Sequence, residues 1–184
     1  MIWPLKRRNP CGKDTISTLY GTIVAQARLP CFYRAYGVAD TVNGRFDLLL
    51  LHMTVVLSRL FTEDGLRELG QGLFDRFCGD MDDNLREMGV GDLKVPKEMR
   101  RIGEAFYGRS QAYMAALKAA QGAGLEELLA RNVYSGSAPE KAAPRRLAAY
   151  MRQAHHDLTD QAAVALGAGE LRFPDPSGVH VDGP

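Results

Sequence analysis

The sequence predicts an all-α fold, a single irregular bundle of about six helices with a loose C-terminal tail. Apolar residues recur at helical spacing along most of the chain. No stretch alternates with the period of two that marks a strand, and no Asn-Gly turn lies between two strands. The length of 184 residues fits about one domain. The 46% of hydrophobic and 24% of charged residues are typical of a globular protein.

The first helix is predicted to begin at a cap formed by Asp14 or Thr15 and to end near Arg28, because Pro30 cannot continue it. After this helix we expect an aromatic connector, residues 30–36, that is not helical. Its rings suit either the core or an anchor for a protein partner, because buried aromatic side chains serve both purposes.

The helix predicted over residues 44–61 is apolar on nearly all sides, which is typical of a helix in the middle of a bundle. Its uncharged stretch, residues 48–58, would reach across only about half of a ~30 Å hydrocarbon core at a rise of ~1.5 Å per residue. We therefore interpret it as a buried helix and not as a membrane span.

Further helices are predicted by apolar spacing and by the breaks between them, over residues 65–88, 97–121, 125–132, 140–155 and 158–166. Gly70 and Gly72 lie inside the first of these, where they indicate close helix packing rather than a phosphate-binding loop. The chain thus divides into a basic segment (1–13), an all-helical domain (14–166) and a Gly- and Pro-rich tail (167–184).

The net charge of +1 hides blocks of opposite sign. Residues 1–34 carry six basic groups and one acid, and residues 94–118 carry six basic groups and two acids. Residues 63–92, between them, carry nine acids and three arginines. We expect no DNA partner from this balance, but the blocks favour charge-steered contacts with other macromolecules.

The N-terminus places Trp3 and Leu5 ahead of Lys6, Arg7 and Arg8, and these apolar and basic residues together suit an anionic membrane surface or ribosomal RNA. Three basic groups give only marginal, reversible contact, so a solvated N-terminus is the favoured interpretation. No apolar run of the length of a secretory signal follows. The three cysteines are widely spaced, which indicates reduced thiols. We therefore expect a cytoplasmic protein with peripheral contact to the inner membrane.

Signatures of catalysis are missing from the sequence, which has no phosphate-binding glycine loop and no G-x-S-x-G turn. The Glu-x-x-His spacing of metal sites in helical bundles is missing too. We expect no enzyme, no cofactor and no metal. His52 lies on the nearly all-apolar helix and leaves two interpretations open: a neutral core histidine, or a group that faces a binding groove.

Arg109 places a charged side chain within the apolar stripe of its helix, four residues before Tyr113. An unpaired buried charge is costly, so Arg109 needs a carboxylate. The candidates are Asp40, Asp47 and Asp92, all at or near predicted helix ends. Arg109 would then form a structural ion pair or, alternatively, recognise a polar group of a partner.

Several stretches, in this order, resemble the ubiquinol–cytochrome c chaperone family. They are L-Y-G at 19–21, Q-A-R-L-P at 26–30, F-Y at 32–33, G-V-A-D-T-V-N-G-R-F-D at 37–47, L-H at 51–52, M-G-V-G-D-L at 88–93, F-Y-G-R at 106–109, A-Y at 112–113 and N-V-Y at 132–134. The similarity covers about residues 15–135.

This resemblance implies an all-helical fold and a role in assembly rather than catalysis. Members of the family bind newly made cytochrome b and promote assembly of the bc1 complex, respiratory complex III. Mitochondrial members also work with a small partner protein near the ribosomal exit, and the lack of their targeting extension here suggests a bacterial protein. The alternative is a helical protein or enzyme that uses His52 to bind haem or another small molecule.

A client with apolar transmembrane helices needs an apolar or aromatic groove, and the methionines 81, 88, 99 and 114 would suit such an adaptable surface. As a hypothesis, the residues that contact the client or another partner are Phe32, Tyr33, Arg45, His52, Lys94, Tyr107, Arg109 and Tyr113.

Overall fold

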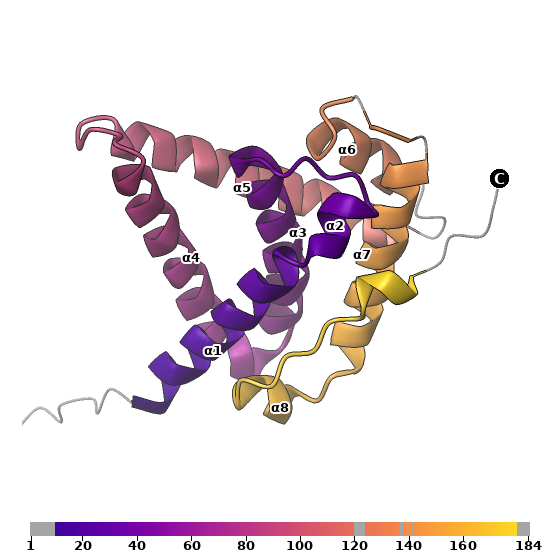
Figure 1. Ribbon diagram of the computed structural model, residues 1–184. Helices are drawn as coiled ribbons and strands as arrows, with labels where there is room; N and C mark the ends of the chain where they lie inside the picture. Colours follow the sequence, from indigo (N-terminus) through magenta and orange to yellow (C-terminus); the bar gives the residue numbers. More distant parts are fainter. Residues whose placement is uncertain (1–9, 120–123, 137, 141, 180–184) are drawn as a thin grey trace, which may run out of the picture.

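Helix α3 (Val42–Thr62) lies at the centre of the molecule, with the other long helices around it (Figure 1). It contacts α1 (Pro10–Ala27), α4 (Arg67–Glu87), α5 (Val95–Lys118) and α7 (Ala142–Asp160). Twelve residues of α3 are buried. This burial on all sides explains why the helix is apolar nearly all round.

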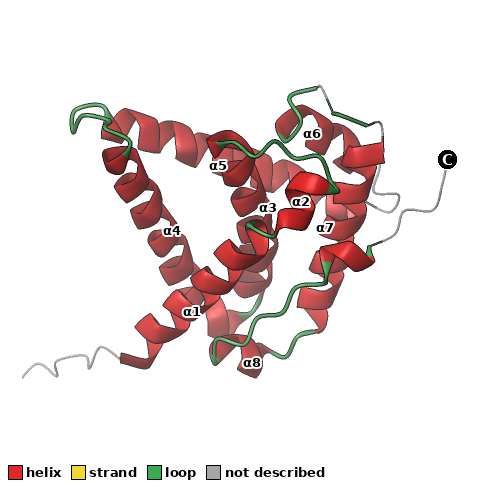
Figure 2. Ribbon diagram, viewed as in Figure 1, coloured by secondary structure: helices red, strands yellow, loops and turns green. Residues whose placement is uncertain are grey.

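The computed structural model describes residues 10–119, 124–136, 138–140 and 142–179, and every regular element in these residues is a helix (Figure 2). Besides the helices named above, the chain forms α6 (Leu125–Asn132), two five-residue helices, α2 (Pro30–Arg34) and α8 (Ala163–Gly167), and two 3-10 turns, η1 (Asp64–Leu66) and η2 (Pro176–Gly178). The predicted all-α, irregular bundle is confirmed. Among the described residues, no helix combines the length and the apolar character needed to cross a membrane.

The N-terminal region differs from the expectation in two places. Helix α1 already begins at Pro10, so residues 10–13 belong to the helix and not to a separate basic segment. Residues 30–34 form the short helix α2 and not a non-helical connector. Pro30 ends α1 but also starts α2, because its fixed φ suits the first turn of a helix. Trp3 and the basic residues 6–8 lie outside the described residues.

Helix α4 packs closely on α1 and α3 through the two glycines of its first turns. A Cβ atom at Gly72 would lie 2.4 Å from Cδ1 of Ile16, and one at Gly70 would lie 3.1 Å from the ring of Phe61. The structure confirms the prediction that these glycines serve close packing. Helix α5 returns from α4 after the turn at residues 88–94, so α1, α4 and α5 enclose a triangle in projection (Figure 1).

The expected loose tail is corrected for residues 168–179, which we call the C-terminal strap. Within it, Leu171 and Pro176 are buried. Its backbone is held by side chains of the domain: Tyr36 donates its hydroxyl proton to the Pro176 carbonyl at 2.7 Å, and Gln26 donates to the Pro174 carbonyl at 3.1 Å. Residues rich in Gly and Pro disfavour a long helix, and here they pack as an irregular segment that ends in the short 3-10 turn η2. Residues 180–184 lie outside the described residues.

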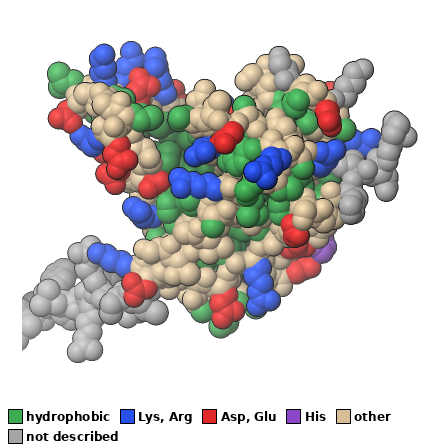
Figure 3. Space-filling view, in the orientation of Figure 1, with side chains coloured by type: hydrophobic (Ala, Val, Ile, Leu, Met, Phe, Trp, Pro, Cys, Tyr) green, Lys and Arg blue, Asp and Glu red, His purple; other side chains and the backbone are tan. Residues whose placement is uncertain are grey.

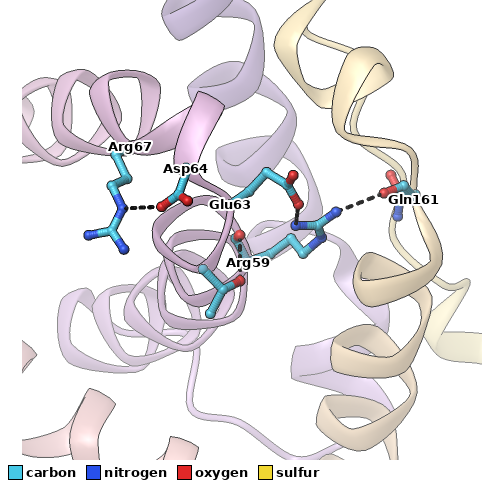
Figure 4. Close-up of polar contacts among 6 residues, drawn as sticks. Arg59, Glu63, Asp64, Arg67 and Gln161 are labelled. Atoms are coloured by element: carbon cyan, nitrogen blue, oxygen red, sulfur yellow. Dashed lines mark hydrogen bonds and ion pairs between the residues drawn. The ribbon is translucent and has the colours of Figure 1, made fainter.

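Arg59 on α3 contacts Gln161, as Figure 4 shows, and the Gln161 side chain in turn holds the strap at Arg172. Arg59 donates to a Glu63 carboxylate oxygen at 2.8 Å and to the Gln161 carbonyl at 3.4 Å. The side-chain amide of Gln161 pairs with both the N–H and the carbonyl of Arg172, each at 2.9 Å. The Gln161 side chain therefore supplies the two backbone hydrogen bonds that a neighbouring β-strand would otherwise provide.

Candidate functional site

An ion pair between Asp47 on α3 and Arg109 on α5 joins two sequence motifs, D-T-V-N-G-R-F-D (40–47) and F-Y-G-R (106–109). Arg109 donates through Nη1 to Oδ1 of Asp47, whose side chain is nearly buried. Burial raises the pKa of Asp47, and the Arg109 guanidinium only partly opposes this effect. Because the carboxylate is desolvated, separating it from Arg109 is costly, so the pair holds α3 and α5 together at this point.

The other two candidate carboxylates pair locally. Asp40 accepts from Nε of Arg45 at 2.8 Å, and Asp92 accepts from Arg86 across the turn after α4. Both partners of each pair are largely exposed to solvent, so each pair contributes little to stability. The pair that spans two helices is therefore the one formed by Asp47.

The first motif forms the N-terminus of α3. Thr41 is the N-cap, and its hydroxyl accepts from the N–H of Gly44 at 3.2 Å. Gly44 faces the preceding backbone so closely that a Cβ atom would lie 2.0 Å from the Ala39 carbonyl oxygen. The motif thus combines a helix cap, a required glycine and the carboxylate of Asp47 within the first two turns of α3.

His52 lies at the centre of the core with 1% of its surface exposed. Its Nδ1 lies 2.7 Å from the Leu48 carbonyl oxygen and therefore carries the proton, and its Nε2 lies 2.9 Å from the Tyr150 hydroxyl. Tyr150 consequently donates to Nε2, and its oxygen accepts from Gln26 at 3.0 Å. Burial lowers the pKa of His52 from 6.5 to about 4, so the imidazole is neutral at physiological pH.

Aromatic rings enclose this histidine on its remaining sides. The ring centroids of Phe32 and Phe173 lie 5.4 and 5.2 Å from that of His52, and Tyr150 lies at 5.6 Å. With both ring nitrogens hydrogen-bonded and no open face, His52 is a core histidine here. This geometry disfavours the alternative in which His52 binds haem or acts as a base.

A groove of about 500 Å³ opens between α1, α3, α4 and α5 (Figure 3). Its apolar lining consists of Val24, Ala27, Val42, Phe46, Leu49, Met81, Leu85, Met88, Ile102 and Ala105. Its polar residues are Arg28, Asn43, Arg45, Asp80, Asn84, Glu98 and Arg101. We call it the α1–α4–α5 groove. Figure 3 shows hydrophobic side chains in this hollow with side chains of both charges around it.

The groove has the character of a protein-binding site rather than of a catalytic one. Its lining is mostly half-buried and aliphatic, and Met81 and Met88 add flexible thioethers that adapt to different side chains. Its volume lies within the range of about 300–1,000 Å³ that is usual for ligand pockets. Such a groove suits an apolar or amphipathic helix that inserts a few side chains from one face.

The eight residues proposed to contact a partner do not come together. Arg45 lines the α1–α4–α5 groove, and Tyr33 is half-buried nearby, with its hydroxyl donating to the Ala27 carbonyl at 3.0 Å. Lys94 lies in the turn before α5, and Tyr107 is 60% exposed, with its ring against Phe74.

The interior holds three of the eight, Phe32, His52 and Tyr113, and these side chains offer no surface to a partner in this conformation. Arg109 is half-buried in its ion pair. Most of the groove lining carries no motif that predicts it, although two of the four methionines proposed as an adaptable surface, Met81 and Met88, do line it. The sequence pattern that could have indicated the groove is the apolar face of α4 and α5. Such a face has the same pattern whether it packs against the core or binds a partner.

Among the described residues, no three His, Cys, Asp or Glu side chains come together as metal ligands. Cys31 and Cys78 are free thiols, and burial raises the pKa of both, so neither is an activated nucleophile.

Residues 34–173, more than half of the chain, match the family profile described as "Ubiquinol-cytochrome C chaperone". The chain belongs to the ubiquinol–cytochrome C chaperone family. The matched region contains both motifs, the central helix α3 and most of the α1–α4–α5 groove.

Among solved structures, the chain is similar to the crystal structure of the Cbp3 homolog from Brucella abortus. The two share 35% sequence identity with a TM-score of 0.84, over 95% of this chain and 97% of that one. No curated protein matches the chain. The likeness extends over nearly the whole length of both proteins, so this family member shares the complete fold of that homolog.

Proposed function

We propose that this protein is a non-enzymatic chaperone that binds newly synthesised cytochrome b and promotes assembly of the ubiquinol–cytochrome c reductase, the bc1 complex. Membership of the ubiquinol–cytochrome C chaperone family is the observation that carries the proposal. The 35% identity with a Cbp3 homolog over 95% of the chain supports it.

We assign the client to the α1–α4–α5 groove. A transmembrane segment of a newly made protein exposes apolar side chains to water until it is inserted and assembled, so it benefits from an apolar docking surface. The groove supplies such a surface between charged residues of both signs, including Arg45 and Glu98. Helix-in-groove binding uses side chains spaced by one helical turn, which suits a segment that is already helical.

Arg109 has a positioning role in this proposal. The walls of the groove come partly from α3, through Phe46 and Leu49, and partly from α5, through Ile102 and Ala105. The ion pair of Arg109 with Asp47 connects these two helices directly. Arg109 therefore supports the groove through this ion pair, and we assign it no direct contact with the client.

The proposed role is tested by deletion of the gene in its source organism, followed by measurement of assembled bc1 complex and co-purification of cytochrome b with the tagged protein. We expect bc1 levels to fall in the deletion strain and cytochrome b to co-purify with the wild-type chain. Normal bc1 levels in the deletion strain would contradict the function itself.

The assigned groove is tested with Ile102→Glu and Met81→Glu, which place a charge in its lining. Both variants should lose cytochrome b while keeping a helical circular dichroism spectrum. Val164→Glu is the matched control, because Val164 is 86% exposed on α8, away from the groove residues. Retention of cytochrome b by both folded groove variants would overturn the assignment and leave the function intact.

The remaining parts of the proposal concern location and further partners. We infer a bacterial, cytoplasmic protein that makes peripheral contact with the inner membrane. Contacts with the ribosomal exit region and with a small assembly partner, as in mitochondrial members, stay predictions for this chain.

A further inference from the structure

The turn between α4 and α5 presents apolar side chains directly to water. Leu93 is 98% exposed, and Met88, at the end of α4, is 58% exposed. We call residues 88–94 the hairpin tip. It forms a corner of the molecule, at the far end of α4 from α8 (Figure 1). A leucine left fully in water at a projecting turn contributes nothing to folding, because it contacts no core.

Unpaired basic side chains lie on the α5 side of this tip. Lys94, Lys97 and Arg100 are exposed, and within the described part of the chain none of them forms an ion pair. Arg86 and Arg101 pair with carboxylates of their own segments. Figure 3 shows hydrophobic, basic and acidic side chains together at this corner. Of the acids nearby, Asp82, Asp92 and Glu98 are paired, whereas Asp83 and Glu87 on the last turns of α4 are exposed and form no ion pair among the described residues. The three unpaired positive charges therefore gather on the α5 side of the tip.

We propose that the hairpin tip docks on an anionic phospholipid surface. Leu93 and Met88 enter the boundary between headgroups and acyl chains, and Lys94, Lys97 and Arg100 contact lipid phosphates. Apolar insertion combined with a neighbouring basic cluster is an arrangement that binds proteins reversibly to anionic bilayers. Neither part is strong alone, so the two act together.

The exposed leucine distinguishes a membrane from nucleic acid as the ligand. RNA phosphates would attract the lysines, but they would leave Leu93 in water. A bilayer takes up both kinds of side chain at once. Membrane docking is therefore the interaction that engages both Leu93 and the three unpaired basic side chains.

The tip adjoins the α1–α4–α5 groove, because Met88 belongs to both. Docking would bring one end of the groove to the membrane surface. For a chaperone of a membrane protein, a consequence that rests on the proposed function, the client would be held where it enters the bilayer. The docking itself is independent of that function and is tested without a client.

The test is flotation of the purified full-length chain with vesicles of phosphatidylcholine containing phosphatidylglycerol, and with vesicles of phosphatidylcholine alone. The wild-type chain should float with the anionic vesicles only. Leu93→Ser should weaken this binding about tenfold, as expected from loss of one inserted leucine. Lys94→Glu combined with Lys97→Glu should weaken it by more than about tenfold, because each basic group contributes separately.

Matched controls carry the same changes elsewhere. Val164→Ser removes an equally exposed apolar side chain from α8, and Lys118→Glu with Arg131→Glu reverses two exposed charges at the ends of α5 and α6. Both controls should bind as the wild-type chain does. Equal binding by the tip variants and by the controls would overturn the proposal.

Insertion is read separately with a single tryptophan at the tip, Leu93→Trp combined with Trp3→Phe. Its emission should shift to the blue with anionic vesicles, because the indole leaves water. An unshifted emission with bound protein would show that another surface docks. Binding to RNA that survives Leu93→Ser, without any vesicle binding, would overturn the proposal in favour of a nucleic-acid contact.

Discussion

The hydroxyl of Tyr150 on α7 lies 2.9 Å from Nε2 of His52 on α3, and this contact completes a buried polar chain from Gln26 to the Leu48 carbonyl. Each polar group in this network has a hydrogen-bond partner, so burying the network costs little free energy. It also links α1, α3 and α7, which lie far apart in the sequence.

Replacement of Tyr150 by phenylalanine should leave Nε2 of His52 without a donor. We expect Tyr150→Phe to lower the free energy of unfolding by roughly 1–3 kcal/mol, the cost of a buried unpaired polar group. Urea unfolding followed by circular dichroism measures this loss. Tyr107→Phe, at an exposed tyrosine, should change stability by less than about 0.5 kcal/mol. Equal effects of the two variants would contradict the buried chain.

The lowered pKa of His52 predicts a dependence of stability on pH. Above pH 6.5 the imidazole is neutral in both states; below it the unfolded chain takes up a proton, while the folded chain stays neutral down to about pH 4. Stability should therefore fall as pH falls through this window, by roughly 3 kcal/mol at most from this group. His52→Gln should flatten this part of the profile relative to the wild-type chain. Parallel profiles would show that His52 does not titrate in this way.

Removal of the Arg109 cation should affect stability mainly through the buried carboxylate of Asp47. In Arg109→Met the Asp47 carboxylate stays buried without a partner, so the pKa of Asp47 should rise further. The folded state then takes up the proton more readily than the unfolded state. We expect the destabilisation by Arg109→Met to be larger at pH 7 than at pH 5. Urea midpoints at both values test this, with Arg109→Lys as the variant that keeps the charge.

Two glycines of the family motifs should respond in opposite ways to alanine. Gly44→Ala forces a methyl group onto the Ala39 carbonyl and should cost about 2 kcal/mol or more. Gly108→Ala meets open space inside α5 and should stabilise the helix by about 0.5–1 kcal/mol. Thermal or urea unfolding compares the two. A neutral Gly44→Ala would mean that the start of α3 is looser than the structure shows.

Gln161 should control the C-terminal strap without controlling the whole fold. Gln161→Ala removes both hydrogen bonds to the backbone of Arg172. Amide hydrogen exchange of residues 170–176 should accelerate, while the amides of α3 keep their protection. Gln153→Ala removes a side-chain contact on the exposed face of α7 and serves as the control. Unchanged exchange in the strap would show that its apolar contacts suffice.

Much of the fold was predictable, because helical periodicity and breakers are local signals. The buried character of α3, the packing role of Gly70 and Gly72 and the all-α class follow from them. The short helix α2 and the packed strap were missed, since a helix of five residues has too little periodicity. A Gly- and Pro-rich segment shows no period at all, and its order depends on distant side chains such as Tyr36 and Gln26.

The candidate site was predicted less well than the fold. An aromatic or charged residue looks alike in the sequence whether it is buried or presented, so Phe32, His52 and Tyr113 were proposed for a surface and lie in the core. The α1–α4–α5 groove comes from four helices that are separated in the chain, and its lining has no motif of its own.

By itself, the sequence determined the helical class, the family, and the need of Arg109 for a carboxylate, because periodicity, motif order and the cost of a buried charge act locally. The tertiary structure alone decided that Asp47 is this carboxylate, that His52 is enclosed and neutral, and that Leu93 stands in water. Burial is the physical reason. It depends on what the rest of the chain brings to each residue, and it determines which charges stay paired, which groups titrate and which surfaces remain free to bind.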